Sequence, residues 1–219
     1  MLLSSREIKD LYDHIVGKQG LSENHIPKKY VHKLDPTQVI ISEINQVDDS
    51  AVRRYCENNL IHSIYYCQAK PNLECQVCFD HPLDHYPLMK QFELIRQFGI
   101  ASCHTHYNVP LEGYIVIANK IHFDYLTFGE LDAPLAIICV DQNVEMNGDI
   151  LKKRDCQFFY VQQGKLCAFA DAALTTMKRD LYQKLRKISR GKMFDMSRSA
   201  TIPTNIDILQ LRAPARAGI

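Results

Sequence analysis

The feature that most constrains the fold of this chain is one helical segment, residues 87–104, whose apolar side chains surround nearly the whole helix. At 100° per residue they cover most of the circumference, which is typical of a helix that is buried on almost every side. These positions are Leu88, Phe92, Leu94, Ile95, Phe98, Gly99, Ala101 and Cys103. A chain of 219 residues is long enough for one large core and short for two, so we expect one main domain around this helix.

The segments before and after this helix are predicted to be strands. β-branched and aromatic residues favour strands, and they are concentrated in ranges 38–44, 60–68, 74–79, 114–128, 134–144, 156–162 and 166–175. Between the last two ranges, Gln163-Gly164-Lys165 predicts a hairpin turn, because Gly accepts φ > 0 at no steric cost. One long helix within an antiparallel meander predicts an α+β fold.

Shorter helices are predicted outside this meander. Ser4 or Ser5, followed by Glu7, is typical of the N-cap of a helix, and Asp48 to Ser50 of the cap of a short helix through Tyr55. After the last strand, a helix is expected over 177–189 and a mobile tail at the end. The expected parts are an N-terminal helix and linker (1–30), a main domain (31–176) and a basic C-terminal helix with its tail (177–219).

The polar residues of the long helix form one continuous stripe. Within about 60° of Glu93, the helical wheel places Tyr86, Lys90, Arg96, Gln97 and His104. The stripe is either the solvent side of the helix or a polar site covered by the neighbouring strands. A covered carboxylate would be paired with Arg96 or have a raised pKa, and both conditions recur at catalytic sites.

A loop rich in histidine and aspartate leads into this helix. It contains Asp80, His81, Asp84 and His85, and Pro87 suits the first helical turn. The spacing matches no usual zinc pattern, and the two thiols of a Cys75-x-x-Cys78 strand would face opposite sides. We therefore expect no metal site.

Composition excludes several classes of protein. Apolar residues make up 46% and charged residues 23%, as in an ordinary soluble protein. The start shows no signal-peptide apolar region, and the apolar run 135–140 is too short to cross a bilayer, so we expect no membrane partner. Without an export signal, we expect the eight cysteines to be reduced thiols. We expect the protein to be cytoplasmic.

Net charge is +1, which gives no general case for nucleic-acid binding, but the basic residues are clustered. Lys28, Lys29 and Lys33 form one cluster, and 152–154 form another in a predicted turn. The third has seven Lys and Arg between Lys178 and Lys192. It is either a solvated helix face or a docking surface for an acidic partner.

The loop and helix resemble a known family. The stretch FDHPLDHYPLMKQFELIRQFG, followed by YIVIANKIHFDYL, resembles the A-factor biosynthesis (AfsA-like) hotdog family, and YVHKLDPTQVIISE looks like its opening strand. The resemblance covers residues 30–175. It implies a hotdog fold, an antiparallel sheet wrapped round a long central helix, that pairs with a second copy into a double hotdog. A homodimer is therefore expected.

The resemblance also implies a site for an acyl thioester, with acyl carrier protein or CoA as acyl donor and no cofactor. Hotdog dehydratases pair a loop His with a helix carboxylate, and here His81 or His85 and Glu93 match those places as catalytic residues. For substrate binding we expect the start of the helix, at Leu88 and Met89, and the polar side chains Arg96 and Gln97.

The family implies transfer of a β-ketoacyl group to the hydroxyl of dihydroxyacetone phosphate, in the biosynthesis of signal molecules or secondary metabolites. The expected activity is therefore that of an acyltransferase. The same residues would suit dehydration of a 3-hydroxyacyl thioester or thioester hydrolysis. A domain that binds acyl chains without chemistry is a further alternative.

Overall fold

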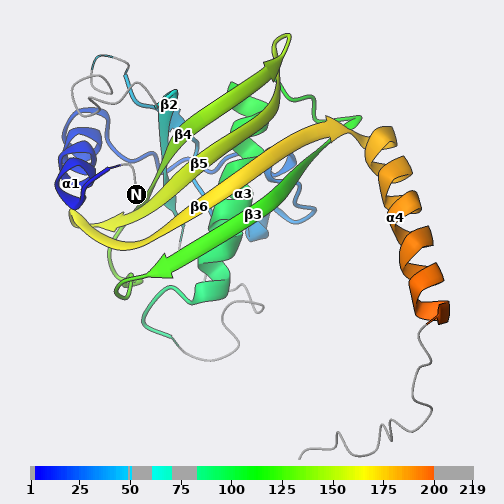
Figure 1. Cartoon of the computed structure of the whole chain (residues 1–219). Coiled ribbons are helices and arrows are strands. Elements are labelled where there is room, and N and C mark those ends of the chain that lie inside the picture. Colours follow the sequence, from blue (N-terminus) through cyan, green and yellow to red (C-terminus); the bar gives the residue numbers. More distant parts are fainter. Residues whose placement is uncertain (1–2, 49, 51–60, 71–82, 200–219) are drawn as a thin grey trace, which may run out of the picture. The chain divides into compact units, whose positions relative to one another are not determined.

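The fold was obtained as a computed structural model, which describes residues 3–48, 50, 61–70 and 83–199, the last eight by their backbone alone. The chain divides into two compact units, residues 1–179 and 180–219. The first unit contains a sheet of six strands, and every pair of neighbouring strands is antiparallel. The strand order β1-β2-β4-β5-β6-β3 places β3 at one edge (Figure 1).

The strands fall close to most of the predicted ranges. They are β1 (Asn45–Gln46), β2 (Ser63–Ala69), β3 (Tyr114–Tyr125), β4 (Leu135–Asn147), β5 (Ile150–Gln162) and β6 (Lys165–Lys178). The turn between β5 and β6 was predicted correctly: Gln163 and Gly164 have φ of 51° and 75°. Two successive positive φ values suit the twist of a two-residue hairpin.

The long central helix is confirmed as α3, Leu88–His106, with Pro87 as its N-cap. Ten of its residues are buried: six belong to the predicted apolar set, and four are the polar residues Lys90, Gln91, Gln97 and Ser102. It packs against one face of the sheet in a core that includes Leu94, Phe98, Phe158 and Tyr160. One antiparallel sheet around one central helix is the fold expected from the sequence.

The other face of the sheet is partly covered by α1, Ser5–His14 (Figure 1). Ser4 caps this helix: its hydroxyl accepts a hydrogen bond from the N–H of Glu7, and the Glu7 side chain bonds back to Ser4. Ile8 and Leu11 of α1 pack against Ile138 and Phe159 of the sheet in a second core. The sheet is therefore apolar on both faces where α1 covers it.

The strand predicted over 38–44 was wrong. This segment makes only isolated bridges, Ser42 with His25 and Ile41 with Ala69, before the short strand β1. Its backbone bonds to the end of β2, through Lys70 N–H to Ile40 O and Ser42 N–H to Gln68 O. Beyond this point it bonds to a side chain: Gln97 accepts from Ile40 N–H at 3.0 Å and donates to Gln38 O at 2.8 Å. A helix side chain thus takes the place of a neighbouring strand.

The turn predicted at 152–154 was also wrong, because these residues lie inside β5. The turn lies earlier, at Gly148, which has a φ of 60°. Arg154 is fully buried and does not belong to a basic surface cluster. The helix predicted after Asp48, the strand over 74–79 and the C-terminal tail lie outside the described residues.

The helix α4, Arg179–Ser199, is longer than the predicted helix, and all of it after Arg179 lies in the second unit. Within the described part of the chain, no helix combines the length and apolar character needed to cross a membrane.

Five of the eight cysteines lie in the described residues, and all five are free and buried. They are Cys67, Cys103, Cys139, Cys156 and Cys167. Burial raises the pKa of Cys103 to about 11 and that of Cys67 well above its ordinary value. These thiols therefore behave as small apolar core residues in the folded chain.

Candidate functional site

Glu93 lies in a cluster of donors between α3 and the segment that follows residue 28. The Nε and Nη2 of Arg96 donate to its two carboxylate oxygens at 2.7 Å each. Gln97 Nε2 donates at 2.8 Å, and Lys33 Nζ lies 2.9 Å from Oε1. The side chain of Glu93 is 23% exposed. The irregular segment around Lys33 therefore partly covers this part of the stripe, and the side chains of Glu93 and Arg96 stay 23% and 39% exposed.

These donors determine the charge of Glu93. Burial alone would raise its pKa, but the hydrogen bonds from Arg96, Gln97 and Lys33 outweigh burial and hold the pKa at about 2. Glu93 is therefore ionised at neutral pH. A carboxylate with so low a pKa is a weak base.

The stripe continues along α3 to His104. Its Nδ1 lies 2.7 Å from Val109 O, and its Nε2 lies 2.9 Å from His32 Nε2. Because a carbonyl oxygen only accepts, Nδ1 of His104 carries a hydrogen and donates it to Val109 O, and one hydrogen lies between the two Nε2 atoms. Burial and the charges of His104, Arg96 and Arg179 lower the pKa of His32.

A second group of predicted residues lies at the start of α3. His85 Nδ1 is 2.8 Å from Asp84 Oδ1, and the His85 ring packs against Phe128 with 4.6 Å between ring centroids and a tilt of 54°. Backbone bonds hold this loop in place: Tyr86 N–H donates to Gly129 O, and Leu131 N–H donates to Asp84 O. The loop backbone is thus held beside the first turn of the helix, whereas the side chains of His85 and Asp84 are 28% and 92% exposed.

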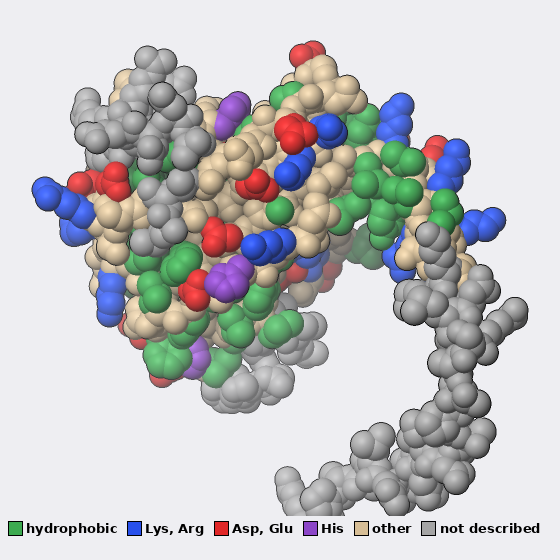
Figure 2. Space-filling model, viewed as in Figure 1, with side chains coloured by type: hydrophobic (Ala, Val, Ile, Leu, Met, Phe, Trp, Pro, Cys, Tyr) green, Lys and Arg blue, Asp and Glu red, His purple; other side chains and the backbone are tan. Residues whose placement is uncertain are grey.

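The surface around His85 is apolar. Leu88 and Met89 in the first turn of α3 are 48% and 65% exposed, and Leu126 and Phe128 after β3 are 55% and 56% exposed. Figure 2 shows hydrophobic side chains gathered on the surface where β3 ends. This patch and the His–Asp pair together would suit an apolar substrate with a group that exchanges a proton.

The structure therefore divides the predicted site residues into two groups. Glu93, Arg96 and Gln97 share one network, whereas His85, Leu88 and Met89 surround the start of α3. His81 lies outside the described residues. Gln97 is fully buried and bonded to the backbone of residues 38 and 40. The catalytic and substrate-binding roles assigned from the sequence stay predictions.

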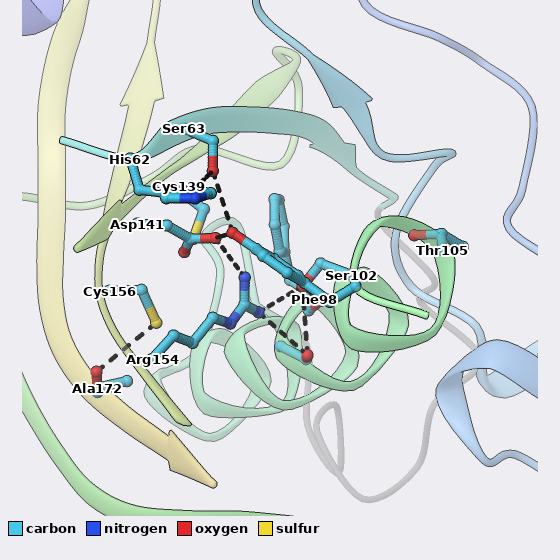
Figure 3. Close-up of polar contacts among 12 residues, drawn as sticks. His62, Ser63, Phe98, Ser102, Thr105, Cys139, Asp141, Arg154, Cys156 and Ala172 are labelled. Atoms are coloured by element: carbon cyan, nitrogen blue, oxygen red, sulfur yellow. Dashed lines mark hydrogen bonds and ion pairs between the residues drawn. The ribbon is translucent and has the colours of Figure 1, made fainter. Parts of the chain in front are cut away.

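Sequence reasoning missed a buried polar network at the other end of the core (Figure 3). Arg154 Nη1 donates to Asp141 Oδ2 at 2.6 Å, and both side chains are fully buried. Arg154 Nη2 reaches α3, donating to Ser102 Oγ at 2.5 Å and to Gly99 O at 3.2 Å. Tyr107 also donates to Asp141 at 2.5 Å. The network joins β4, β5 and α3.

A sequence signal for this network existed. Strand side chains alternate between faces, so Arg154 falls in the inward series of Cys156, Phe158 and Tyr160. Asp141 falls likewise in the inward series of β4 with Cys139. Two opposite charges at inward positions of neighbouring strands predict a buried ion pair.

The same region contains three atoms that would suit a metal ion, from Cys139, Asp141 and Cys156. The carboxylate, however, already binds Arg154 and Tyr107. Burial raises the pKa of Cys139 well above its ordinary value, whereas metal ligation needs thiolates. The donor set therefore fits a structural network better than a metal centre.

The fold and the two groups of residues define an α+β hotdog domain. The chain matches the family described as the A-factor biosynthesis hotdog domain over residues 21–178, and it belongs to that family. A comparison with curated proteins finds none that matches.

Several solved structures resemble the chain at low identity. A hot-dog-like protein from Thermanaerovibrio acidaminovorans is 14% identical with a TM-score of 0.46, covering 59% of this chain and 91% of that one. A thioesterase superfamily member from Thermus thermophilus is 10% identical with a TM-score of 0.41, over 60% and 92% of the two chains. A variant thioesterase from Pseudomonas aeruginosa is 8% identical with a TM-score of 0.38, over 62% and 81%.

Proposed function

We propose that this protein transfers a β-ketoacyl group from a thioester, on acyl carrier protein or CoA, to a small hydroxylated acceptor such as dihydroxyacetone phosphate. Family membership supports an acyl thioester as the substrate class. The observation that carries a catalytic role is the Asp84–His85 pair beside the exposed apolar start of α3. The pair supplies a base, and the apolar surface supplies contacts for an acyl chain.

In the proposed reaction, Asp84 orients the ring of His85, and His85 Nε2 takes the proton of the acceptor hydroxyl. The acceptor oxygen attacks the thioester carbon, and the carbonyl becomes an oxyanion. The first N–H groups of a helix have no intrahelical acceptor, and α3 has no side-chain cap among the described residues. The N–H groups of Leu88 and Met89 are therefore available to stabilise the oxyanion. Protonated His85 then returns its proton to the departing thiolate.

Glu93 is not the base in this proposal. Its pKa of about 2 and its bonds to Lys33 and Arg96 make it a fixed anion that holds the N-terminal segment against α3. His81, four residues before His85 in the sequence, is the competing base.

The test incubates the full chain with a β-ketoacyl thioester, with and without dihydroxyacetone phosphate, and identifies products by mass spectrometry. An ester is expected. Free acid alone would favour a thioesterase, and conversion of a 3-hydroxyacyl thioester to an enoyl thioester would favour a dehydratase. If no product forms from any of these thioesters, the protein is better explained as a module that binds acyl chains without chemistry.

Variants test the assigned base. His85→Ala is expected to lower turnover about 100-fold or more with little change in melting temperature, the scale of losing an acid–base group. A matched control is His122→Ala on β3, because His122 also lies beside a carboxylate, Asp124, at 3.3 Å but is 61% exposed. A large loss in His81→Ala with none in His85→Ala would reassign the base to His81.

A further inference from the structure

Two histidines near the end of α3 form a pair that the proposed reaction does not use. His32 Nε2 lies 2.9 Å from His104 Nε2, and His104 Nδ1 donates to Val109 O at 2.7 Å. At 1.5 Å per residue, His104 lies about 24 Å from Leu88 along the axis of α3. The histidine pair is therefore well separated from the start of the helix, where His85 and the proposed thioester site lie.

Positively charged side chains approach this pair from two directions. Arg96 Nη2 lies 3.4 Å from the carbonyl oxygen of Val31, the residue directly before His32. The N–H of Arg179 donates to Gly113 O at 2.8 Å, which joins the end of β6 to the loop that follows α3. The pair therefore has one arginine on α3 and another at the end of β6 as neighbours.

The charges of these neighbours change the titration of the pair. Burial, and then the charges of His104, Arg96 and Arg179, lower the pKa of His32. A nearby like charge makes a further proton unfavourable, whereas a nearby opposite charge favours it. An anion bound beside the two rings would therefore be stabilised by the arginines and would favour protonation of the rings.

Glu93 does not neutralise this positive charge. Its carboxylate is bonded to Arg96 at 2.7 Å and to Lys33 at 2.9 Å, so one negative charge is shared by two positive ones. Arg96 uses Nε and Nη2 for Glu93, is 39% exposed, and keeps Nη1 for another acceptor. His32 and Arg179 are exposed as well, so a ligand can reach all three side chains from solvent.

We propose that His32, His104, Arg96 and Arg179 form a binding site for a phosphate group, which carries about two negative charges at neutral pH. One hydrogen lies between the two Nε2 atoms without a ligand. With the anion present, the pair takes up one more proton, and each Nε2 donates to an oxygen of the anion. Nη1 of Arg96 and the guanidinium of Arg179 supply further charge-assisted hydrogen bonds. This site is separate from the proposed function and does not depend on it.

A metal ion fits the histidine pair less well. His104 has the orientation of a metal ligand, because its other ring nitrogen donates to a carbonyl oxygen. However, the described part of the chain offers the two rings no third His, Cys, Asp or Glu ligand. The charges of Arg96 and Arg179 would also repel a cation.

The test titrates inorganic phosphate and sulfate into the full chain by calorimetry, with sodium chloride keeping the ionic strength constant. Sulfate takes up no proton near neutral pH, so any proton taken up with it belongs to the protein. We expect saturable binding of both anions, with uptake of about one proton per bound sulfate at neutral pH. Sulfate should bind at least fivefold more weakly at about pH 8 than at about pH 6, the range in which histidine titrates. Absence of binding, or the same sulfate affinity at both pH values, would overturn the proposal.

A first variant removes one ring of the pair. His32 has a φ of 54°, and asparagine tolerates this left-handed conformation, so His32→Asn should fold with little change in melting temperature. It should bind sulfate at least fivefold more weakly and without proton uptake. His122→Asn, on β3 beside Asp124, is the matched control and should change the affinity less than twofold. Unchanged sulfate binding by His32→Asn would overturn the proposal, as would binding of Zn²⁺ to the unaltered pair in place of both anions.

A second variant removes one of the charges. Arg179→Gln should weaken sulfate binding at least threefold, and it should raise the pKa of His32 measured by NMR without the anion, because one charge that lowers this pKa is gone. Lys165→Gln removes a positive charge at the opposite end of β6 and should change neither quantity. If Arg179→Gln behaves like Lys165→Gln, Arg179 does not belong to the site and the proposal fails.

Discussion

Arg154 and Asp141 illustrate how single residues fix the central helix to the sheet. Both are fully buried, and Arg154 reaches from β5 to the backbone of Gly99 and the hydroxyl of Ser102 on α3. Burial and the Asp141 carboxylate raise the pKa of Tyr107, so its hydroxyl stays protonated and donates to Asp141. Both charged groups therefore depend on partners within the core, although Arg154 Nε itself is buried without a hydrogen bond.

Loss of one partner should destabilise the fold strongly. Asp141→Asn leaves Arg154 as a buried charge without a carboxylate, for which a loss of about 3–5 kcal/mol in the free energy of unfolding is typical. Urea denaturation measures it. Glu145→Gln, which removes an exposed partner of Lys152, is the matched control on β4 and should cost less than about 1 kcal/mol. A cost for Asp141→Asn as small as the control's would refute this interpretation.

The ionisation of Glu93 should make the free energy of unfolding depend on pH in the acidic range. Its pKa of about 2 in the folded chain lies below the ordinary value of 4.5, so the folded state favours the ionised form. Its contribution is present above pH 4.5 and is lost as pH falls towards 2. The difference in unfolding free energy between the unaltered protein and Glu93→Gln should therefore be constant from neutral pH to about pH 5 and then shrink. A difference that stays constant down to pH 2 would contradict the assigned network.

The sequence identified Glu93, Arg96 and Gln97 as one stripe, because helical periodicity alone places them together. The sequence did not identify which segment lies over these residues. Lys33 is far from Glu93 along the chain, and the contact between them depends on the path of an irregular segment. Arg154 was missed for a different reason: a run of basic residues reads as a solvated surface unless strand alternation is considered.

At the scale of elements, the segment 38–44 shows how a tertiary contact overrides strand propensity. Its β-branched residues favour a strand, but Gln97 occupies the backbone groups of Ile40 and Gln38 that a neighbouring strand would pair. Most of β3, β4 and β6 and the second half of β5 were predictable from their β-branched and aromatic residues, and α3 from its helical periodicity, whereas this segment and the first half of β5 were not.

Gln97→Met should lower stability, because it removes the hydrogen bonds that the Gln97 side chain makes with Ile40 N–H and Gln38 O. The expected loss is about 2 kcal/mol or more, the scale of unpaired buried polar groups. Gln142→Met on β4 is the control for the substitution type and should change stability little. If Gln97→Met leaves stability unchanged and raises KM for the thioester, the substrate-binding role predicted for Gln97 is correct instead.

At the scale of the whole molecule, the family match covers residues 21–178, which leaves both α1 and α4 as additions to the hotdog domain. β3 lies at the sheet edge and pairs only with β6 among the described residues. An unpaired strand edge readily pairs with another chain. The edge is therefore the surface at which the predicted homodimer would form.

The protein is expected to have the mass of two chains by light scattering at micromolar concentration. Ile121→Lys, at a position of β3 that is 38% exposed, should shift it towards one chain, because charge on an edge strand opposes pairing. Met146→Lys near the end of β4, 43% exposed, should leave the mass unchanged. A single-chain mass for the unaltered protein would contradict the prediction.

The buried thiols give this protein its own reporters of transient opening. Maleimide reagents react with thiolates that solvent reaches, and both conditions fail at Cys67 in β2 and Cys167 in β6 while the sheet is closed. Labelling at each position would then proceed only as fast as that part of the sheet opens. The order in which mass spectrometry finds them modified would reveal which side of the sheet separates first, without any introduced probe.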